Sequence, residues 1–193
     1  MDELRNDPAF REAANRDPKA ELLADAFSWL KVILFAMAFA LIFTNFVIVN
    51  ASVPTASMEG TIRVNDRIIA FRLSYLFSAP QTFDIIVFRG PDDSDTLYVK
   101  RIVGVGGDTV NIVDGRVYIN ESAAPLRDDF VSGSLIGNWG PFEVPEGHFF
   151  VLGDNRSNSV DSRHWENTFV ERRQILGRAI FRYFPGFQNL TNT

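Results

Sequence analysis

Two residues that could act together as a nucleophile and a general base are Ser57 and Lys100. Ser57 lies in PTASMEGTIRVND (54–66), just after the longest apolar run of the chain. Lys100 interrupts the apolar stretch TLYVKRIVGV (96–105), whose pattern predicts a strand. Burial there would disfavour the ammonium and lower the lysine pKa, so that a neutral amine could take the serine proton. A surface lysine whose stem covers the sheet is the alternative interpretation of this strand taken alone.

Other kinds of catalytic or binding chemistry have few residues to use. Cysteine is absent, which excludes thiol catalysis, disulfides and thiolate metal sites. A Ser-His-Asp triad would need His148 or His164, and both read better as turn or surface residues. A zinc site of Cys and His cannot be assembled, and we expect neither a metal nor a cofactor. The net charge of -5 gives a nucleic-acid partner no electrostatic support.

Ser57 is preceded in the sequence by a long uncharged run at 32–51. A helix of that length spans a bilayer, so we predict a transmembrane signal anchor over 29–52 after a polar segment 1–28. Asp17 and Pro18 are candidates for the N-cap and first helical position. A buried core helix is one alternative. A signal peptide cleaved after Val49-Asn50-Ala51 is another, but the long run and long polar head favour a retained anchor.

The rest of the chain, 53–193, predicts one antiparallel β-rich domain. Short apolar runs separated by turn residues predict strands at 84–90, 96–105, 148–154 and 175–184, and a hairpin over 109–120 around Asp114-Gly115. The stretch 120–147 reads as an irregular excursion. The expected fold class is therefore mainly β, with one N-terminal transmembrane helix. Aromatic-rich stretches at 71–83 and 181–187 fit either a lipid surface or a core.

Three stretches in this order resemble the boxes of bacterial type I signal peptidases. They are PTASMEGTIRVND, then DIIVFRGP with TLYVKRIVGVGGD, then GDNRSNSVDSRHW, and the likeness covers about 30–184. These enzymes are membrane-bound Ser-Lys proteases that remove signal peptides from exported preproteins. The resemblance implies a single-pass protein of the inner (cytoplasmic) membrane, and the basic residues before the span favour an N-terminus inside.

The resemblance also implies roles for individual residues. Ser57 corresponds to the nucleophile and Lys100 to the general base. The main-chain N–H of Ser57 and the hydroxyl of Thr55 correspond to an oxyanion hole, and Ser159 to the residue that orients the lysine. The remaining matches near the site are a structural ion pair and two residues of the same loop: Asp161 with Arg163, and Asp154 with Arg156.

The implied partners are signal peptides and the lipid bilayer, while the oligomeric state stays open. The substrate would bind extended against a strand edge, with small side chains in shallow pockets. Candidates for the pocket lining, chosen because they flank the dyad in sequence, are Val53, Met58, Tyr98 and Val99.

Two positions depart from the pattern of the family. Gly60 stands where proline is usual, which removes a restraint on φ. Asn65 stands where glycine is usual, and we expect the turn to survive because asparagine tolerates a positive φ. Competing interpretations are a self-cleaving repressor-type Ser-Lys protease and a membrane-anchored β-domain for binding. The membrane span argues against the first, and the intact set of Ser57, Lys100 and Ser159 against the second.

Overall fold

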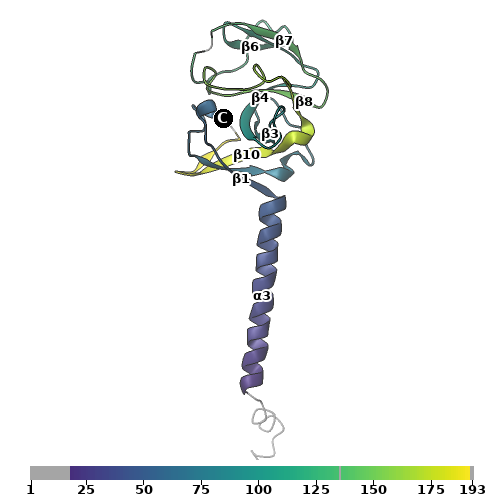
Figure 1. Cartoon of the computed structure of the whole chain (residues 1–193), viewed down its shortest axis with the longest axis vertical. Coiled ribbons are helices and arrows are strands. Elements are labelled where there is room, and N and C mark those ends of the chain that lie inside the picture. The colour runs from purple at the N-terminus through teal and green to yellow at the C-terminus, as the bar shows by residue number, and fades with distance from the viewer. Residues whose placement is uncertain (1–17, 135, 192–193) are drawn as a thin grey trace, which may run out of the picture. The chain divides into compact units, whose positions relative to one another are not determined.

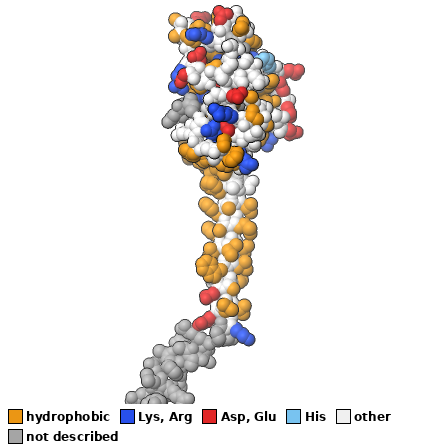
Figure 2. Space-filling model, turned by 90° about the vertical axis from the view of Figure 1, so that its left-hand side faces the viewer, with side chains coloured by type: hydrophobic (Ala, Val, Ile, Leu, Met, Phe, Trp, Pro, Cys, Tyr) orange, Lys and Arg blue, Asp and Glu red, His pale blue; other side chains and the backbone are white. Residues whose placement is uncertain are grey.

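The structure is a computed structural model, and it describes residues 18–134 and 136–191. The chain divides into two compact units, one up to Thr44 and one from Asn45 onward. The first contains most of the long helix α3 (Pro18–Phe46), which begins at the predicted first helical position. Its segment Glu21–Phe46 is long and apolar enough to cross a membrane. Apolar side chains cover this helix along its length (Figure 2), a pattern that suits a lipid environment rather than a water-facing surface.

The boundary between helix and β-domain differs from the expected one at 52. The helix ends at Phe46, six residues before the predicted end of the anchor, and Ile48–Ser52 forms strand β1. Val47 already accepts a hydrogen bond from the N–H of Arg72 (2.9 Å), and β1 pairs with β2 over its whole length. Tertiary pairing with β2 therefore outweighs the helical continuation that the apolar sequence favours.

The second unit is built on antiparallel sheets, which confirms the predicted fold class. Among the described residues, eight strands form one sheet with the path β1-β2-β10-β3-β4-β8-β9, and β11 pairs with β10. A second sheet has the order β6-β5-β7. The other strands are β2 (Arg67–Phe71), β3 (Ile85–Arg89), β4 (Leu97–Val105), β5 (Thr109–Val113), β6 (Arg116–Ile119), β7 (Trp139–Glu143), β8 (His148–Leu152), β9 (Val170–Glu171), β10 (Ile175–Phe184) and β11 (Gln188–Asn189).

The strand β10 joins the two halves of the large sheet. It pairs with β2 on one side and with β3 on the other, so β1 and β2 connect to β3 and β4 only through it. Figure 1 shows the small sheet at one end of this unit and β1 with β10 at the other. Buried apolar side chains form three clusters, and the cluster next to β1 and β2 includes Met58 and Ile62.

All of the predicted strands are present. The runs at 84–90, 96–105, 148–154 and 175–184 correspond to β3, β4, β8 and β10. The hairpin of β5 and β6 turns at Asp114 (φ 47°) and Gly115 (φ 79°), as the Asp-Gly pair predicts. The excursion 120–147 is not wholly irregular, since it contains β7, which pairs with β5. Three short 3-10 helices complete the description, at Ala56–Met58, Arg72–Tyr75 and Arg172–Gln174.

Candidate active site

Ser57 sits in a short loop that is closed at its base and anchored in the core. The loop base is held by hydrogen bonds from the N–H of Val53 to the carbonyl of Asp66 (3.0 Å) and from the N–H of Asn65 to the carbonyl of Val53 (2.8 Å). Asn65 has φ 69°, which confirms that asparagine adopts the turn there. Met58, which follows Ser57, is fully buried and fixes the 3-10 turn that carries Ser57. We call 53–66 the nucleophile loop.

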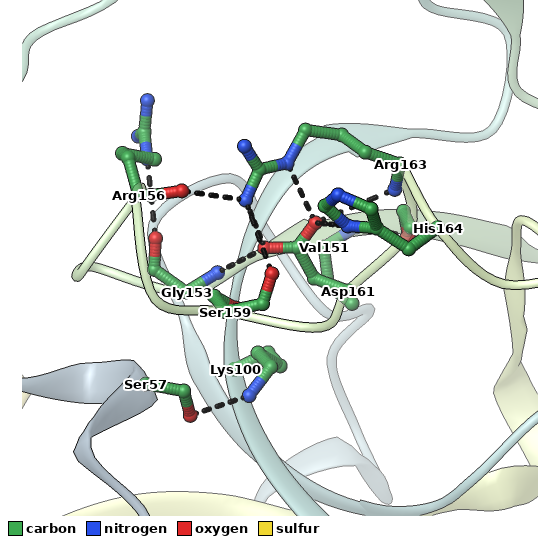
Figure 3. A network of polar contacts seen from close by, with 10 residues as sticks. Ser57, Lys100, Val151, Gly153, Arg156, Ser159, Asp161, Arg163 and His164 are labelled. Atoms are coloured by element: carbon green, nitrogen blue, oxygen red, sulfur yellow. Dashed lines mark hydrogen bonds and ion pairs between the residues drawn. The ribbon is translucent and has the colours of Figure 1, made fainter. Parts of the chain in front are cut away.

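Lys100 points from β4 to the hydroxyl of Ser57. Its Nζ and the Ser57 Oγ form a hydrogen bond of 2.6 Å, and the two side chains lie side by side in Figure 3. Lys100 is only 3% exposed and Ser57 only 7%. Burial lowers the lysine pKa to about 8, with Arg163 acting in the same direction, while the charges of Asp161 and Asp154 oppose the shift. A useful fraction of this amine is therefore neutral near neutral pH.

Two donors for a developing oxyanion lie beside Ser57. The Oγ1 of Thr55 is 3.3 Å from the Ser57 Oγ. The main-chain N–H of Ser57 donates no hydrogen bond within the described parts of the chain. Thr55 is the residue before the 3-10 turn, and its extended backbone (φ −121°, ψ 157°) sets its side chain next to the turn. A substrate carbonyl placed against Ser57 could therefore find both donors.

A buried ion pair holds the part of the nucleophile loop that follows Ser57. Arg101 donates from Nε and Nη2 to the two carboxylate oxygens of Asp154 at 2.8 and 2.7 Å. The Oγ1 of Thr61 donates to Asp154 Oδ2 at 2.6 Å and accepts from Arg101 Nη2 at 3.2 Å. Neither Arg101 nor Thr61 is among the residues predicted from the sequence. Arg101 could have been suspected, because it follows Lys100 directly in a strand that is otherwise apolar.

The loop after β8 contains the second cluster of expected residues (Figure 3). Asp161 and Arg163 form an ion pair, with Arg163 Nε 2.7 Å from Asp161 Oδ1. Burial opposes the ionisation of Asp161, but the bonds from Arg163 and from the Gly153 N–H hold its pKa below the usual value. Arg156 is buried and bonds to the carbonyl of Gly153, whereas Asp154, its neighbour in the same loop, pairs with Arg101.

Ser159 does not make the hydrogen bond expected of a lysine-orienting residue. Its buried Oγ does not bond to Lys100 and lies instead beside Asp161, where it helps to hold the pKa of that carboxyl below its usual value. Lys100 directs its Nζ to Ser57 instead. Ser159 nevertheless lines the same groove as Lys100, so its hydroxyl is available close to the dyad.

The glycine before this cluster allows a close backbone approach. A Cβ at Gly153 would lie 2.4 Å from the carbonyl oxygen of Ser57 and 2.3 Å from the Oγ of Ser159. That same Ser57 carbonyl accepts a hydrogen bond from the N–H of Asn155 (3.0 Å). The end of β8 can therefore pack against the nucleophile only because residue 153 has no side chain.

A groove of about 700 Å³ passes over the dyad. All four residues proposed from sequence as pocket lining, Val53, Met58, Tyr98 and Val99, line it. One side is β1, an edge strand of the sheet. The other is the start of β4, where 97–100 pair with β3, whereas the pairing with β8 begins at 101. The groove thus lies between two strand segments whose outer backbone groups lack a strand partner in the described chain.

The two histidines lie in positions that do not support a triad. His164 is partly exposed, with its Nδ1 3.7 Å from Asp161 Oδ1, and His148 bonds to the carbonyl of Glu146. In the described residues the hydroxyl of Ser57 bonds only to Lys100 and Thr55. No group of three His, Asp or Glu within 18–134 and 136–191 is arranged to hold a metal ion.

Comparison with known proteins gives matches over most of the chain. Residues 26–184 match the family described as signal peptidase, peptidase S26. Similar proteins include a signal peptidase I of Leptolyngbya laminosa, 37% identical over 92% of this chain and 88% of that protein. A probable signal peptidase I-2 of Synechocystis sp. is 36% identical over 82% of this chain and 74% of that protein. A crystal structure of a signal peptidase I from Enterococcus faecalis V583 is 30% identical with a TM-score of 0.41, covering 52% of this chain and 97% of that one.

Proposed function

The chain belongs to the signal peptidase family, peptidase S26, and from this premise we propose that Ser57 and Lys100 are the dyad with which it cleaves signal peptides from exported preproteins. Membership of this family makes the protein a serine peptidase. The observation that carries the assignment of the dyad is the 2.6 Å hydrogen bond between two buried side chains at the floor of a peptide-sized groove.

In the proposed reaction the neutral amine of Lys100 accepts the proton of the Ser57 hydroxyl as Oγ attacks the scissile carbonyl carbon. The N–H of Ser57 and the hydroxyl of Thr55 stabilise the negative oxygen of the tetrahedral intermediate. The Lys100 ammonium then gives its proton to the leaving amine, and the mature protein departs. A water, deprotonated by the regenerated amine, attacks the acyl-Ser57 and releases the signal peptide.

The buried position of Lys100 makes this base possible. With a pKa of about 8, roughly one amine in ten is neutral at pH 7, compared with about one in a few thousand at the ordinary value of 10.5. The nearby carboxylates Asp161 and Asp154 then favour the ammonium that forms during the reaction. Ser159 would supply a hydroxyl to the amine from the groove wall.

We propose that the substrate binds in the groove as an added strand. The unpaired backbone of β1 on one side and of 97–100 on the other supplies hydrogen-bond partners for an extended peptide. Val53, Met58 and Val99 line the groove near Ser57 and would leave room only for small side chains. Tyr98, stacked on Phe88 and in edge-to-face contact with Trp165, forms a rigid wall.

The membrane arrangement is part of the same proposal. The apolar helix α3 would span the bilayer of the cell membrane, with the N-terminus inside and the β-domain outside. Of the two aromatic stretches, 71–83 contains both a buried Tyr75 and a Phe77 that is 95% exposed, and 181–187 ends at an exposed Phe187. These exposed rings are the side chains that would meet lipid.

The test compares the full chain in detergent micelles with its Ser57→Ala and Lys100→Ala variants on a purified preprotein. We expect wild type to release the mature protein and both variants to be inactive while keeping the same circular dichroism spectrum. Processing by either variant at the wild-type rate would overturn the dyad.

A further inference from the structure

We infer that residues 130–133, here called the brace segment, hold Ser57 in position, with Ser132 as a positioning residue of the dyad. The inference rests on the proposed function of Ser57 and extends it to a part of the chain that carries no recognisable catalytic motif. The brace segment belongs to the excursion 120–147, far from the nucleophile loop in sequence.

Ser132 is tied to the loop after β8 through its main chain. Its N–H donates to the carbonyl of Asp154 (2.8 Å), and its carbonyl accepts from the N–H of Arg156 (3.0 Å). These bonds form a parallel bridge between Ser132 and Asn155. Asn155 in turn donates its N–H to the carbonyl of Ser57 (3.0 Å). The position of Ser132 is therefore fixed relative to the backbone that contacts the nucleophile.

The side chain of Ser132 reaches the nucleophile loop itself. Its hydroxyl donates to the carbonyl of Glu59, two residues after Ser57. The space for this contact comes from Gly60, which has φ +114° and no side chain. A Cβ there would lie 2.9 Å from the carbonyl oxygen of Phe130 and 3.2 Å from the Ser132 Oγ.

Gly60 therefore has a structural explanation. Proline, with φ fixed near −65°, could not adopt the conformation of residue 60. A proline would stiffen this loop through its own ring, whereas here the restraint comes from the brace segment packed against the glycine. Residues 130–133 thus restrain the nucleophile loop, a restraint that the loop's own sequence does not provide.

The same segment also covers the ion pair behind the loop. The ring of Phe130 lies over the guanidinium of Arg101, 3.9 Å from centroid to Cζ. Arg101 bonds to Asp154 and to Thr61, and Thr61 belongs to the nucleophile loop. The brace segment consequently touches the loop at Glu59 and Gly60 and covers the group that fixes Thr61.

These contacts bear on the chemical step rather than on substrate binding. Residues 130–133, all of them described, do not line the groove. Loosening the loop would increase the mean separation of Ser57 Oγ and Lys100 Nζ without changing the pocket walls. A small misplacement of a reacting group costs up to about 100-fold in rate.

The experiment measures kcat and KM of the full chain in detergent with a signal-peptide substrate, for wild type, Ser132→Ala, Ser132→Thr and Ser134→Ala. Ser134 is exposed and lies in the same excursion, so it is the matched control. We expect Ser132→Ala to lower kcat roughly 10- to 100-fold with KM unchanged, and Ser132→Thr to restore it. We expect Ser134→Ala to behave as wild type.

Ser57→Ala in the same series separates the inference from the function it rests on. If Ser57→Ala is active, the proposed dyad is wrong. If Ser57→Ala is inactive but Ser132→Ala keeps its kcat, or loses affinity instead, the positioning role is wrong and the dyad stands. A double variant, Gly60→Ala with Ser132→Ala, tests whether the two residues act through the same contact. If they do, the fold-loss in kcat of the double variant is smaller than the product of the two single fold-losses.

Discussion

Lys100 and Arg101, consecutive residues of β4, hold the same loop at two points. Lys100 bonds to the hydroxyl of Ser57, and Arg101 bonds to the hydroxyl of Thr61, four residues further along the nucleophile loop. Neighbouring residues of a strand point to opposite faces, so the loop is held from both sides of β4. The strand β4 therefore contributes two of the contacts that hold Ser57 close to Lys100.

Replacing Lys100 with methionine should remove activity and stabilise the fold at pH 7. A folded-state pKa near 8 against an ordinary 10.5 means that holding the buried ammonium costs on the order of 3 kcal/mol. Because the folded pKa is the lower one, the unfolded wild-type chain binds more protons between about pH 8 and 10.5. Its free energy of unfolding should rise with pH across that window, and that of Lys100→Met should lack this rise. Urea unfolding of both proteins at pH 7, 8, 9 and 10 measures the difference.

The same lysine predicts the pH dependence of catalysis. The reactive form is the neutral amine, so kcat/KM should fall about tenfold per pH unit below pH 8 and level off above it. A rate profile from pH 5 to 10 on a substrate without titrating groups measures this. A flat profile through pH 6 to 8 would contradict the role of Lys100 as base.

Thr55→Val should lower kcat by about 100-fold and leave KM nearly unchanged, because a donor to the oxyanion acts only once the charge develops. Valine keeps the shape of threonine and removes the hydroxyl. The conservative Thr55→Ser variant should recover most of the rate. Equal kcat in Thr55→Val and wild type would remove Thr55 from the oxyanion hole.

Asp154→Asn should destabilise the domain by about 3–5 kcal/mol, because Arg101 would remain buried with its charge unbalanced. The control is Asp129→Asn, since Asp129 pairs with Arg127 at the surface, where such pairs contribute about 0–1 kcal/mol. Thermal unfolding followed by circular dichroism compares the two. Similar melting temperatures for both variants would show that the buried pair is not a stabilising element.

Gly153→Ala should reduce both activity and stability, because the new methyl would overlap the Ser57 carbonyl and the Ser159 hydroxyl. Gly186→Ala is the matched control, as nothing lies within 4 Å of a Cβ built there. Overpacking of this kind typically costs about 1–3 kcal/mol. Unfolding curves and processing rates of the two variants measure the effect, and equal values would mean that the loop shifts freely.

Much of the fold could be predicted from sequence because its strands carry local signals. The Asp114-Gly115 turn and the apolar runs of β3, β4, β8 and β10 are of this kind. β1 was missed because its residues, Ile48–Ser52, continue an uncharged run, and periodicity cannot separate a short apolar strand from the end of a helix. Only pairing with β2 makes it a strand.

The site was predictable where the family resemblance supplied residues and unpredictable where contacts are long-range. Ser57 and Lys100 were predicted from the resemblance, and the structure places their side chains within hydrogen-bonding distance, while their catalytic roles stay predictions. Ser132 was not predicted, because nothing in the sequence around it indicates a contact with the carbonyl of Glu59, 73 positions away. Arg101 and Thr61 are buried polar residues whose partners become visible only in three dimensions.

The place of β10 in the sheet has a consequence for the newly made enzyme. Ser57 follows β1, Lys100 lies on β4, and the two halves are joined through β10, which is synthesised after both. A chain ending before Ile175 should therefore show no cleavage of preprotein, a result that processing assays on such truncations would establish. A nascent chain in which β10 has not yet been made would then lack the sheet that brings Ser57 and Lys100 together, so we expect it to be inactive on preproteins.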